Sequence, residues 1–303
     1  MKRNRGSIAL ILTALIWGSS FVVTKALLEE AGPMSVSVLR FLVAWVLLVP
    51  FAWQHGYRLS FTLQPMLLLF GLTGIAIYFG MFNLGLVFTS ASSAALIQAG
   101  IPAITTLLSV FLLKERVSRL QWLGIALSVM GLLLITGLST NREGTAPVLG
   151  NLLVVGSVLA WAVYTVQGKK LVSSASWVVI TMASIGAGLL CLLPFAIGEL
   201  WLQGPPHLHA DGLLQLLYLG GFCSALGYSL WNYGLRFLDA SQAAPYVNLQ
   251  PVVGLLLGVL ILHEPFGIVQ IGGGTLTLFG VLLSNKGQRS SADSKHQNAD
   301  IKS

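Results

Sequence analysis

NLGLVF at residues 83–88 and NYGLRF at residues 232–237 are two copies of one pattern, 149 residues apart. The same offset aligns identical residues further along the chain, among them Pro102 with Pro251, Glu115 with Glu264 and Gly131 with Gly280. Upstream, an offset of 144 matches Trp17 to Trp161 and Pro50-Phe51-Ala52 to Pro194-Phe195-Ala196. A five-residue insertion between about Ala196 and Leu216 reconciles the two offsets. The chain is therefore an internal duplication of one unit.

The composition places both copies in a lipid bilayer. Hydrophobic residues make up 55% of the chain and charged residues only 9%, against roughly 25% charged in an average soluble domain. Apolar runs of about 20 residues recur, the length that an α-helix needs to cross the hydrocarbon core. We therefore expect an all-α integral membrane protein with ten transmembrane helices, near Ile8–Leu27, Met34–Trp53, Pro65–Phe88, Ala91–Leu113, Arg119–Leu138, Pro147–Gln167, Trp177–Glu199, Leu213–Arg236, Ser241–Leu262 and Phe266–Asn285.

The distribution of positive charge gives an orientation. With a cytoplasmic N-terminus, the outer loops hold only Lys25 and Arg142, Arg40 falls inside a span, and every other Lys and Arg faces the cytoplasm. This bias obeys the positive-inside rule and predicts a multi-pass protein of the plasma (inner) membrane with both termini cytoplasmic. The polar segment 287–303 is expected to be a disordered cytoplasmic tail. The formal charge of +7 forms no basic stripe, so no nucleic-acid partner is expected.

Each copy contains an odd number of predicted spans, so the second must enter the membrane from the opposite side. The expected domains are a first five-helix repeat at residues 1–138 and a second at 147–286. Inverted repeats are typical of secondary transporters, in which a site at the interface of the halves faces each side of the membrane in turn.

The chain resembles the EamA-type branch of the drug/metabolite transporter superfamily over about residues 8–285. The resemblance rests on ALIWGSSFVVTKALLEE (14–30), SVLRF (37–41) and the paired segments ASSAALIQAGIPAITTLLSVFLLKERVSRLQWLGIALSVMGLLLI (91–135) and ASQAAPYVNLQPVVGLLLGVLILHEPFGIVQIGGGTLTLFGVLL (240–283). It implies a ten-helix metabolite transporter, often a bacterial exporter of amino acids or other small polar compounds, with a central cavity lined by both halves. It also includes Arg40 as a common family feature.

The predicted function is alternating-access export of small metabolites such as amino acids, acting on a small-molecule substrate within the lipid bilayer as a monomer or homodimer. A passive facilitator or channel is the alternative, since no Asp or Glu lies deep in a predicted span. An enzyme is not expected, because the hydrolase, metalloprotease and P-loop motifs are missing from the sequence. His207, His209 and Asp211 lack further ligands in their loop, so neither a metal nor a cofactor is predicted.

Arg40 lies about six residues below the outer end of the second predicted helix. An intramembrane charge is a functional candidate by default. One hypothesis is a clamp for a substrate carboxylate. The other is a snorkelling side chain that pairs with Glu29 or Glu30 and orders the outer loop.

Polar and aromatic side chains inside the spans need partners, and so face neighbouring helices or a wet cavity. The candidates for substrate contact, besides Arg40, are Trp17, Tyr78, Asn83, Gln98, Trp161, Tyr164, Asn232, Tyr246, Asn248 and Gln250. Asn83 and Asn232 occupy matching positions, so interhelical hydrogen bonding is the competing explanation for both. The unsymmetric set Tyr246, Asn248 and Gln250 has no such explanation.

Two further predictions follow from the repeat. Pro102 and Pro251 are expected mid-helix at equivalent places, where a missing hydrogen bond kinks the helix and creates either a hinge or a fixed bend. Glu115 and Glu264 are expected at matching helix ends; Glu115 has Lys114 and Arg116 as neighbours, whereas Glu264 has only His263. If transport is proton-driven, Glu264 is the predicted coupling residue.

Overall fold

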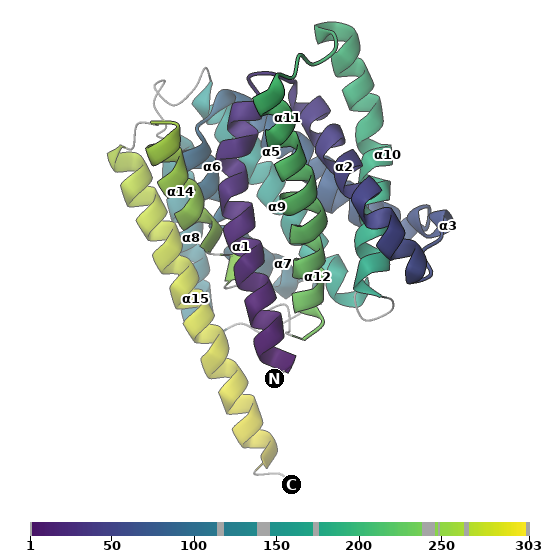
Figure 1. The fold of residues 1–303 in the computed structure, drawn as a ribbon. Helices are drawn as coiled ribbons and strands as arrows, with labels where there is room; N and C mark the ends of the chain where they lie inside the picture. The colour runs from purple at the N-terminus through teal and green to yellow at the C-terminus, as the bar shows by residue number, and fades with distance from the viewer. Residues whose placement is uncertain are drawn as a thin grey trace.

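The computed structural model describes residues 2–113, 118–137, 146–171, 176–237, 246–247, 249–263 and 267–300. Within these ranges the regular structure is helical, with no strand. The helices stand side by side in one bundle, and the N- and C-terminal ends project from the same end of it (Figure 1).

The first repeat begins with two long helices and then becomes interrupted. Its elements are α1 (Lys2–Leu27), α2 (Pro33–Gln54), the short α3 (Leu59–Thr62), α4 (Pro65–Gly71), the π-helical stretch η1 (Leu72–Ile77), α5 (Tyr78–Phe88), α6 (Ala91–Gln98), α7 (Ile101–Leu113) and α8 (Arg119–Gly137). The second repeat contains α9 (Pro147–Leu171), α10 (Trp177–Gln203), α11 (Ala210–Leu217), the π-helical η3 (Tyr218–Leu226), α12 (Gly227–Leu235), α14 (Leu249–Ile261) and α15 (Ile268–Asp300).

Seven of the described helical segments are long and apolar enough to cross a membrane: Asn4–Leu27, Pro33–Gln54, Pro65–Phe88, Ala91–Leu108, Pro147–Gly168, Trp177–Gln203 and Ala210–Leu235. Three shorter apolar helices, Arg119–Ile135, Leu249–Ile261 and Ile268–Ser284, lie where the other predicted spans were placed. The all-α, multi-span membrane fold is thus confirmed. The exact number of ten crossings stays a prediction.

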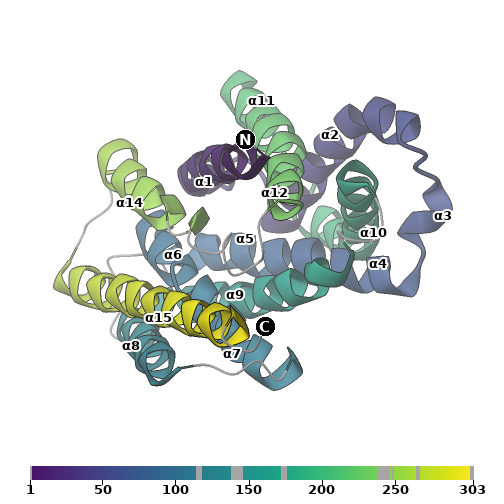
Figure 2. The ribbon, with the colours of Figure 1, turned by 90° about the horizontal axis from the view of Figure 1, so that it is seen from below.

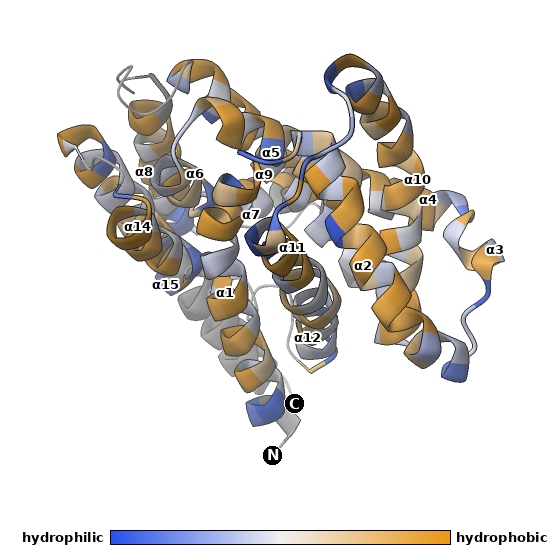
Figure 3. Cartoon of the chain, turned by 45° about the horizontal axis from the view of Figure 1, so that its top comes forward, coloured by the Kyte–Doolittle hydropathy of each residue, from blue (hydrophilic) through white to orange (hydrophobic). Residues whose placement is uncertain are grey.

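The helices are built mostly of hydrophobic residues (Figure 3), and many of their large apolar side chains are exposed, as on a lipid-facing surface. Phe51 and Phe195, which the repeat aligns, are 59% and 65% exposed, while the adjacent Ala52 and Ala196 are buried. A water-soluble protein rarely exposes contiguous apolar surface on this scale. The two aromatic residues therefore mark equivalent lipid-facing positions in the two halves.

The close crossing of α8 with α15 shows that the repeats are inverted. These two helices occupy equivalent places in the two copies and lie side by side in both views (Figures 1 and 2). A Cβ on Gly131 would lie 2.5 Å from the carbonyl oxygen of Gly273, and one on Gly280 would lie 2.5 Å from that of Gly124. Early residues of one helix thus meet late residues of the other, so the helices are antiparallel. Equivalent helices running in opposite directions define an inverted repeat.

Hydrogen bonds at this crossing follow the same symmetry. The Ser128 hydroxyl donates to the carbonyl oxygen of Thr277 at 2.9 Å, and the Thr277 hydroxyl lies 3.5 Å from the carbonyl oxygen of Ser128. The two residues are 149 positions apart, which is the repeat offset. The pseudo-twofold axis that relates the halves therefore passes between them.

The third helix of each repeat carries a π-helical stretch at the same place. The stretch η1 ends at Ile77 and η3 ends at Leu226, positions that the repeat offset aligns. A π-helix has one more residue per turn than an α-helix and often occurs at functional sites. Composition and periodicity gave no sign of it, because the apolar pattern of these helices is unbroken.

Two other features differ from the sequence-based expectations. The helix expected at Ala91–Leu113 is interrupted at Ala99 and Gly100, so Pro102 lies in the first turn of α7 rather than mid-helix. That position suits a residue without an N–H group. At the C-terminus, α15 continues as a helix to Asp300, where a disordered tail was expected from residue 287. No proline or further glycine follows Gly287, and extending an existing helix requires no new nucleus.

Candidate functional site

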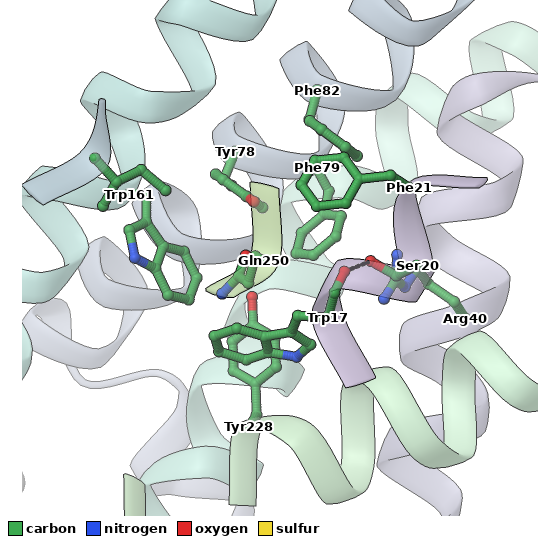
Figure 4. A pocket seen from close by; sticks show the side chains of 11 residues that line it. Trp17, Ser20, Phe21, Arg40, Tyr78, Phe79, Phe82, Trp161, Tyr228 and Gln250 are labelled. Atoms are coloured by element: carbon green, nitrogen blue, oxygen red, sulfur yellow. Dashed lines mark hydrogen bonds between the residues drawn. The ribbon is translucent and has the colours of Figure 1, made fainter. Parts of the chain in front are cut away.

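A chamber lies between the two halves of the bundle (Figure 4). It contains about 430 Å³ of space that no atom fills, part of which is open to the outside. Its described lining residues come from α1, α2, α5, α7, α9, α12 and α14, and are Trp17, Ser20, Phe21, Arg40, Tyr78, Phe79, Phe82, Ile101, Trp161, Tyr228 and Gln250. Both repeats contribute to the wall.

The chamber lies on the pseudo-twofold axis. Trp17 and Trp161, which the repeat aligns, meet each other edge to face with ring centroids 5.4 Å apart. Two further aligned pairs, Phe79 with Tyr228 and Ile101 with Gln250, also line the wall. Residues related by a twofold axis come together only near that axis. The chamber is therefore central between the inverted halves, where a transporter of this architecture binds its cargo.

Aromatic rings form most of the wall, seven of the eleven described lining residues. Tyr228 packs against Trp17 and Trp161 with centroid distances of 5.4 and 5.9 Å, and Tyr78 lies 5.1 Å from Trp161. These distances fall in the range of favourable aromatic pairs, each worth about 0.5–1.5 kcal/mol beyond burial. The rings hold one another in place, so the chamber has a defined apolar surface.

The π-helical stretches fix two of these rings. The Tyr228 hydroxyl donates to the carbonyl oxygen of Gly74 at 3.1 Å, and Trp17 Nε1 donates to that of Cys223 at 2.8 Å. Gly74 lies in η1 and Cys223 in η3, at positions that the repeat offset aligns. Each π-helical stretch thus presents an equivalent carbonyl to an aromatic side chain of the chamber.

Arg40 is the only charged side chain among the described lining residues, and it is 1% exposed. Its Nε donates to the Ser224 hydroxyl at 3.0 Å, while its buried Nη1 has no hydrogen-bond partner. The guanidinium carbon lies 4.6 Å from the ring centroid of Phe79 and 5.5 Å from that of Phe41. These cation–π contacts offset part of the cost of burying the charge. The guanidinium points toward Ser20 at the chamber wall (Figure 4).

The proposed ion pair of Arg40 with Glu29 or Glu30 is not formed. The Glu30 carboxylate accepts a hydrogen bond from the backbone N–H of His209 at 2.8 Å and lies 3.5 Å from His209 Nδ1. Glu29 is exposed. Among the residues that the structure describes, none provides a carboxylate within 4.0 Å of Arg40. The charge is buried in the bundle rather than snorkelling to the outer loop.

Asn83 and Asn232 link helices instead of lining the chamber. Asn83 Nδ2 donates to the Ser37 hydroxyl at 2.8 Å, and Asn232 Nδ2 donates to the Thr181 hydroxyl at 2.7 Å. Ser37 and Thr181 are themselves aligned by the repeat. The same bridge therefore joins the second and third helices of each half, which agrees with the interhelical explanation of these residues.

The remaining predicted residues divide between wall, interior and the undescribed part of the chain. Trp17, Arg40, Tyr78, Trp161 and Gln250 line the chamber, whereas Gln98, Tyr164 and Tyr246 do not. Gln98 donates to the Ser157 hydroxyl, Tyr164 stacks on Phe70, and the Tyr246 hydroxyl donates to Ser7. Asn248 and Glu264 lie outside the described residues. Pro251 was expected mid-helix, but among the described residues it lies in the first turn of α14, which begins at Leu249.

Sequence reasoning missed Phe21, Phe79, Phe82, Ile101 and Tyr228 in the wall. Apolar residues in a membrane protein face lipid, protein or cavity alike, so their chemistry alone does not distinguish them. The sequence did contain one signal for two of them. Phe79 and Tyr228 are aligned by the repeat and lie just before the matching segments at residues 83–88 and 232–237.

An apolar multi-span bundle of two inverted repeats around a central chamber defines a membrane transporter. Comparison with known proteins agrees: the model of the EamA-like transporter family matches residues 4–137 and 148–286. The chain belongs to this family. The two matched segments fall within the two predicted repeats.

Relatives extend over nearly the whole chain. An uncharacterized transporter of Archaeoglobus fulgidus is 30% identical over 91% of this chain and 97% of its own length. A protein of Salmonella typhimurium named "Probable amino-acid metabolite efflux pump" is 30% identical over 95% of this chain and 97% of its own length. A "Probable terminal-alkyne amino-acid exporter" of Streptantibioticus cattleyicolor is 28% identical over 94% and 95%. A solved crystal structure shares the fold with a TM-score of 0.66 at 19% identity, over 93% of this chain and 98% of the other.

Proposed function

We propose that this protein exports small metabolites, amino acids among them, across the plasma membrane, and that the central chamber is the substrate site. One observation carries the proposal: the chamber lies on the pseudo-twofold axis, where Trp17 meets its repeat partner Trp161. A rocking of the halves about such an axis exchanges access between the two membrane faces without moving the site. The names of the Salmonella and Streptantibioticus relatives support export and amino-acid cargo.

The orientation in the membrane is part of the proposal. Both chain ends project from one end of the bundle (Figure 1), and the positive-inside bias supports placing that end in the cytoplasm. The opposite end, with the α1–α2 and α10–α11 connections, would then face outward. One copy of the chain supplies the described chamber wall, so a monomer is sufficient and a homodimer is not required for the site.

At the proposed outer end, two carboxylates tie the halves together. Glu199, near the end of α10, accepts hydrogen bonds from the backbone N–H groups of Met34 at 3.0 Å and Ser35 at 2.7 Å, at the start of α2. Glu30, after α1, accepts one from His209 at the start of α11. A carboxylate at a helix N-terminus satisfies free N–H groups and complements the helix dipole. These bonds join the halves at this end, and we expect them to break when cargo leaves.

The test is flux through the purified full-length protein in proteoliposomes, with amino acids as cargo and with or without an imposed pH gradient. We expect concentrative flux that depends on the gradient, because an exporter must move cargo against its own gradient. Flux that only equilibrates would instead indicate a facilitator. Absence of flux for every amino acid, in protein shown to be folded, would contradict the proposed cargo.

A further inference from the structure

We infer that the chamber selects aromatic monocarboxylates, and that it recognises the carboxylate and the ring while leaving the α-amino group of an amino acid unrecognised. This inference deepens the proposed function and rests on it. It predicts that acids without any amino group bind as well as the corresponding amino acids.

The buried charge of Arg40 is only partly compensated. Arg40 Nη1 has two N–H donors and no partner, although Nε of the same guanidinium is bonded to Ser224. An uncompensated ion buried in a membrane protein is costly, and the contacts with Phe79 and Phe41 offer no hydrogen-bond acceptor. A carboxylate supplies both the opposite charge and the acceptors, in the geometry that guanidinium groups prefer. The free donor is thus suited to an anionic group that enters the chamber.

The described wall offers the guanidinium no carboxylate of its own. Ile101, the first residue of α7 after the turn at Ala99 and Gly100, lines the chamber with an apolar side chain. It therefore adds no acceptor to the wall.

An ammonium group would find no opposite charge in the described wall. None of the described lining residues is Asp or Glu, so the described wall provides no ion pair for a cation. The Arg40 charge repels a cation in a medium of low dielectric, and the guanidinium already lies over the ring of Phe79. The polar groups left for an amine are neutral and include the hydroxyls of Ser20 and Tyr78 and the amide of Gln250, which is directed into the chamber (Figure 4). The amino group therefore gains less on binding than the carboxylate.

The rest of the ligand would meet an aromatic wall. Trp17, Tyr78, Trp161 and Tyr228 form a connected set of rings with centroid distances from 5.1 to 5.9 Å. Such a wall pairs with a further ring in offset or edge-to-face geometry. The chamber is therefore suited to a carboxylate that carries an aromatic ring.

The experiment compares three ligands that share one ring: phenylalanine, 3-phenylpropionate, which lacks the amine, and phenethylamine, which lacks the carboxylate. Binding to the full-length protein in lipid nanodiscs is measured by calorimetry, with quenching of tryptophan fluorescence as a second readout because Trp17 and Trp161 line the site. Equilibrium binding is measured instead of flux, because a weak acid also crosses a lipid bilayer without the protein. We expect the dissociation constant of 3-phenylpropionate to lie within about threefold of that of phenylalanine. Phenethylamine should bind at least about tenfold more weakly, because it loses one charge-assisted contact with Arg40.

Two variants assign the effect to Arg40. Arg40→Gln should reduce the preference for acid over amine to less than about threefold. Ser184→Ala is the matched control, because Ser184 is the repeat partner of Arg40, is buried and does not line the chamber. It should leave the preference unchanged. The comparison of ligands on the unmodified protein stands even if Arg40→Gln does not fold.

Equal or tighter binding of phenethylamine would overturn the inference, and so would failure of all three ligands to bind. Neither result bears on the flux experiment, which uses all amino acids and reports transport directly. Gradient-driven flux together with a preference for the amine would keep the proposed function and reject the assignment of substrate class.

Discussion

Trp17 and Trp161, equivalent residues of the two repeats, contact each other at the centre of the protein, yet only Trp17 is tied to a π-helical carbonyl. The duplication supplies the same side chain twice, and the surroundings give the two copies different roles. Trp17 fixes η3 through Cys223, whereas Trp161 packs between Trp17, Tyr78 and Tyr164.

This difference predicts an unequal effect of two identical substitutions. Trp17→Phe removes the donor to the buried carbonyl of Cys223 and should lower the free energy of unfolding by about 1–3 kcal/mol, the cost of an unsatisfied buried group. Trp161→Phe loses only packing and should cost less. Thermal unfolding of the two purified variants in the same detergent measures the difference; equal melting temperatures would contradict the assigned role of Trp17.

The glycine crossing of α8 and α15 predicts a position that tolerates no side chain. Gly131→Val would place Cβ 2.5 Å from the carbonyl oxygen of Gly273, and we expect loss of folded protein or a destabilisation of about 3 kcal/mol or more, as for severe overpacking.

Gly272 is the control for this substitution. It lies beside Gly273 on α15, and a Cβ added to it meets nothing within 4 Å. Gly272→Val should therefore be tolerated. Monodispersity in size-exclusion chromatography and the melting temperature report both results, and similar behaviour of the two variants would show that the crossing is not tight.

The carboxylate of Glu199, at the proposed outer end, should hold the protein closed. Glu199→Ala removes two hydrogen bonds to the start of α2 and should cost about 0.5–2 kcal/mol of stability, as for loss of a helix cap. It should also increase the fraction of molecules that are open to the outside.

Opening can be measured by the rate at which an impermeant maleimide labels a Ser20→Cys reporter from outside, in a chain whose Cys191 and Cys223 are replaced by Ala. Glu29→Ala is the control, because Glu29 is an exposed carboxylate nearby. If both variants label at the parental rate, the bonds of Glu199 do not restrain the closed state.

The paired bridges from Asn83 and Asn232 predict structural rather than binding phenotypes. Asn83→Ala and Asn232→Ala should each lower stability by about 0.6–1.7 kcal/mol, the range measured for hydrogen bonds between membrane helices. Ligand affinity should stay within about twofold, since neither residue lines the chamber. A tenfold loss of affinity at unchanged melting temperature would place them in the binding site after all.

The fold could be predicted largely from the sequence because a bilayer permits few architectures. Length and apolarity locate helices, and the matched copies at residues 83–88 and 232–237 show the duplication. The break before Ile101 and the two π-helical stretches could not be predicted. They depend on contacts with other helices, such as that of Tyr228 with Gly74, and not on local composition.

The site was predicted less well for a physical reason. The rarity of polar groups in lipid led to Arg40 and Gln250, which line the wall, but equally to Asn83 and Gln98, which bond to neighbouring helices. Aromatic residues gave no such signal: Phe79 faces the chamber and Phe51 faces lipid. Only the packing of the helices separates these two environments.

The two π-helical stretches also let both halves keep the same spacing of side chains. Each accommodates a wider turn at the same aligned place, before Tyr78 and before Gly227. Outside such a turn, one residue more or less would rotate every later side chain of an α-helix by about 100°. Tyr78 and Phe82, or Tyr228, would then turn away from the chamber. The aligned third helices of the two halves contain no such shift, and both therefore direct aromatic residues at the same chamber.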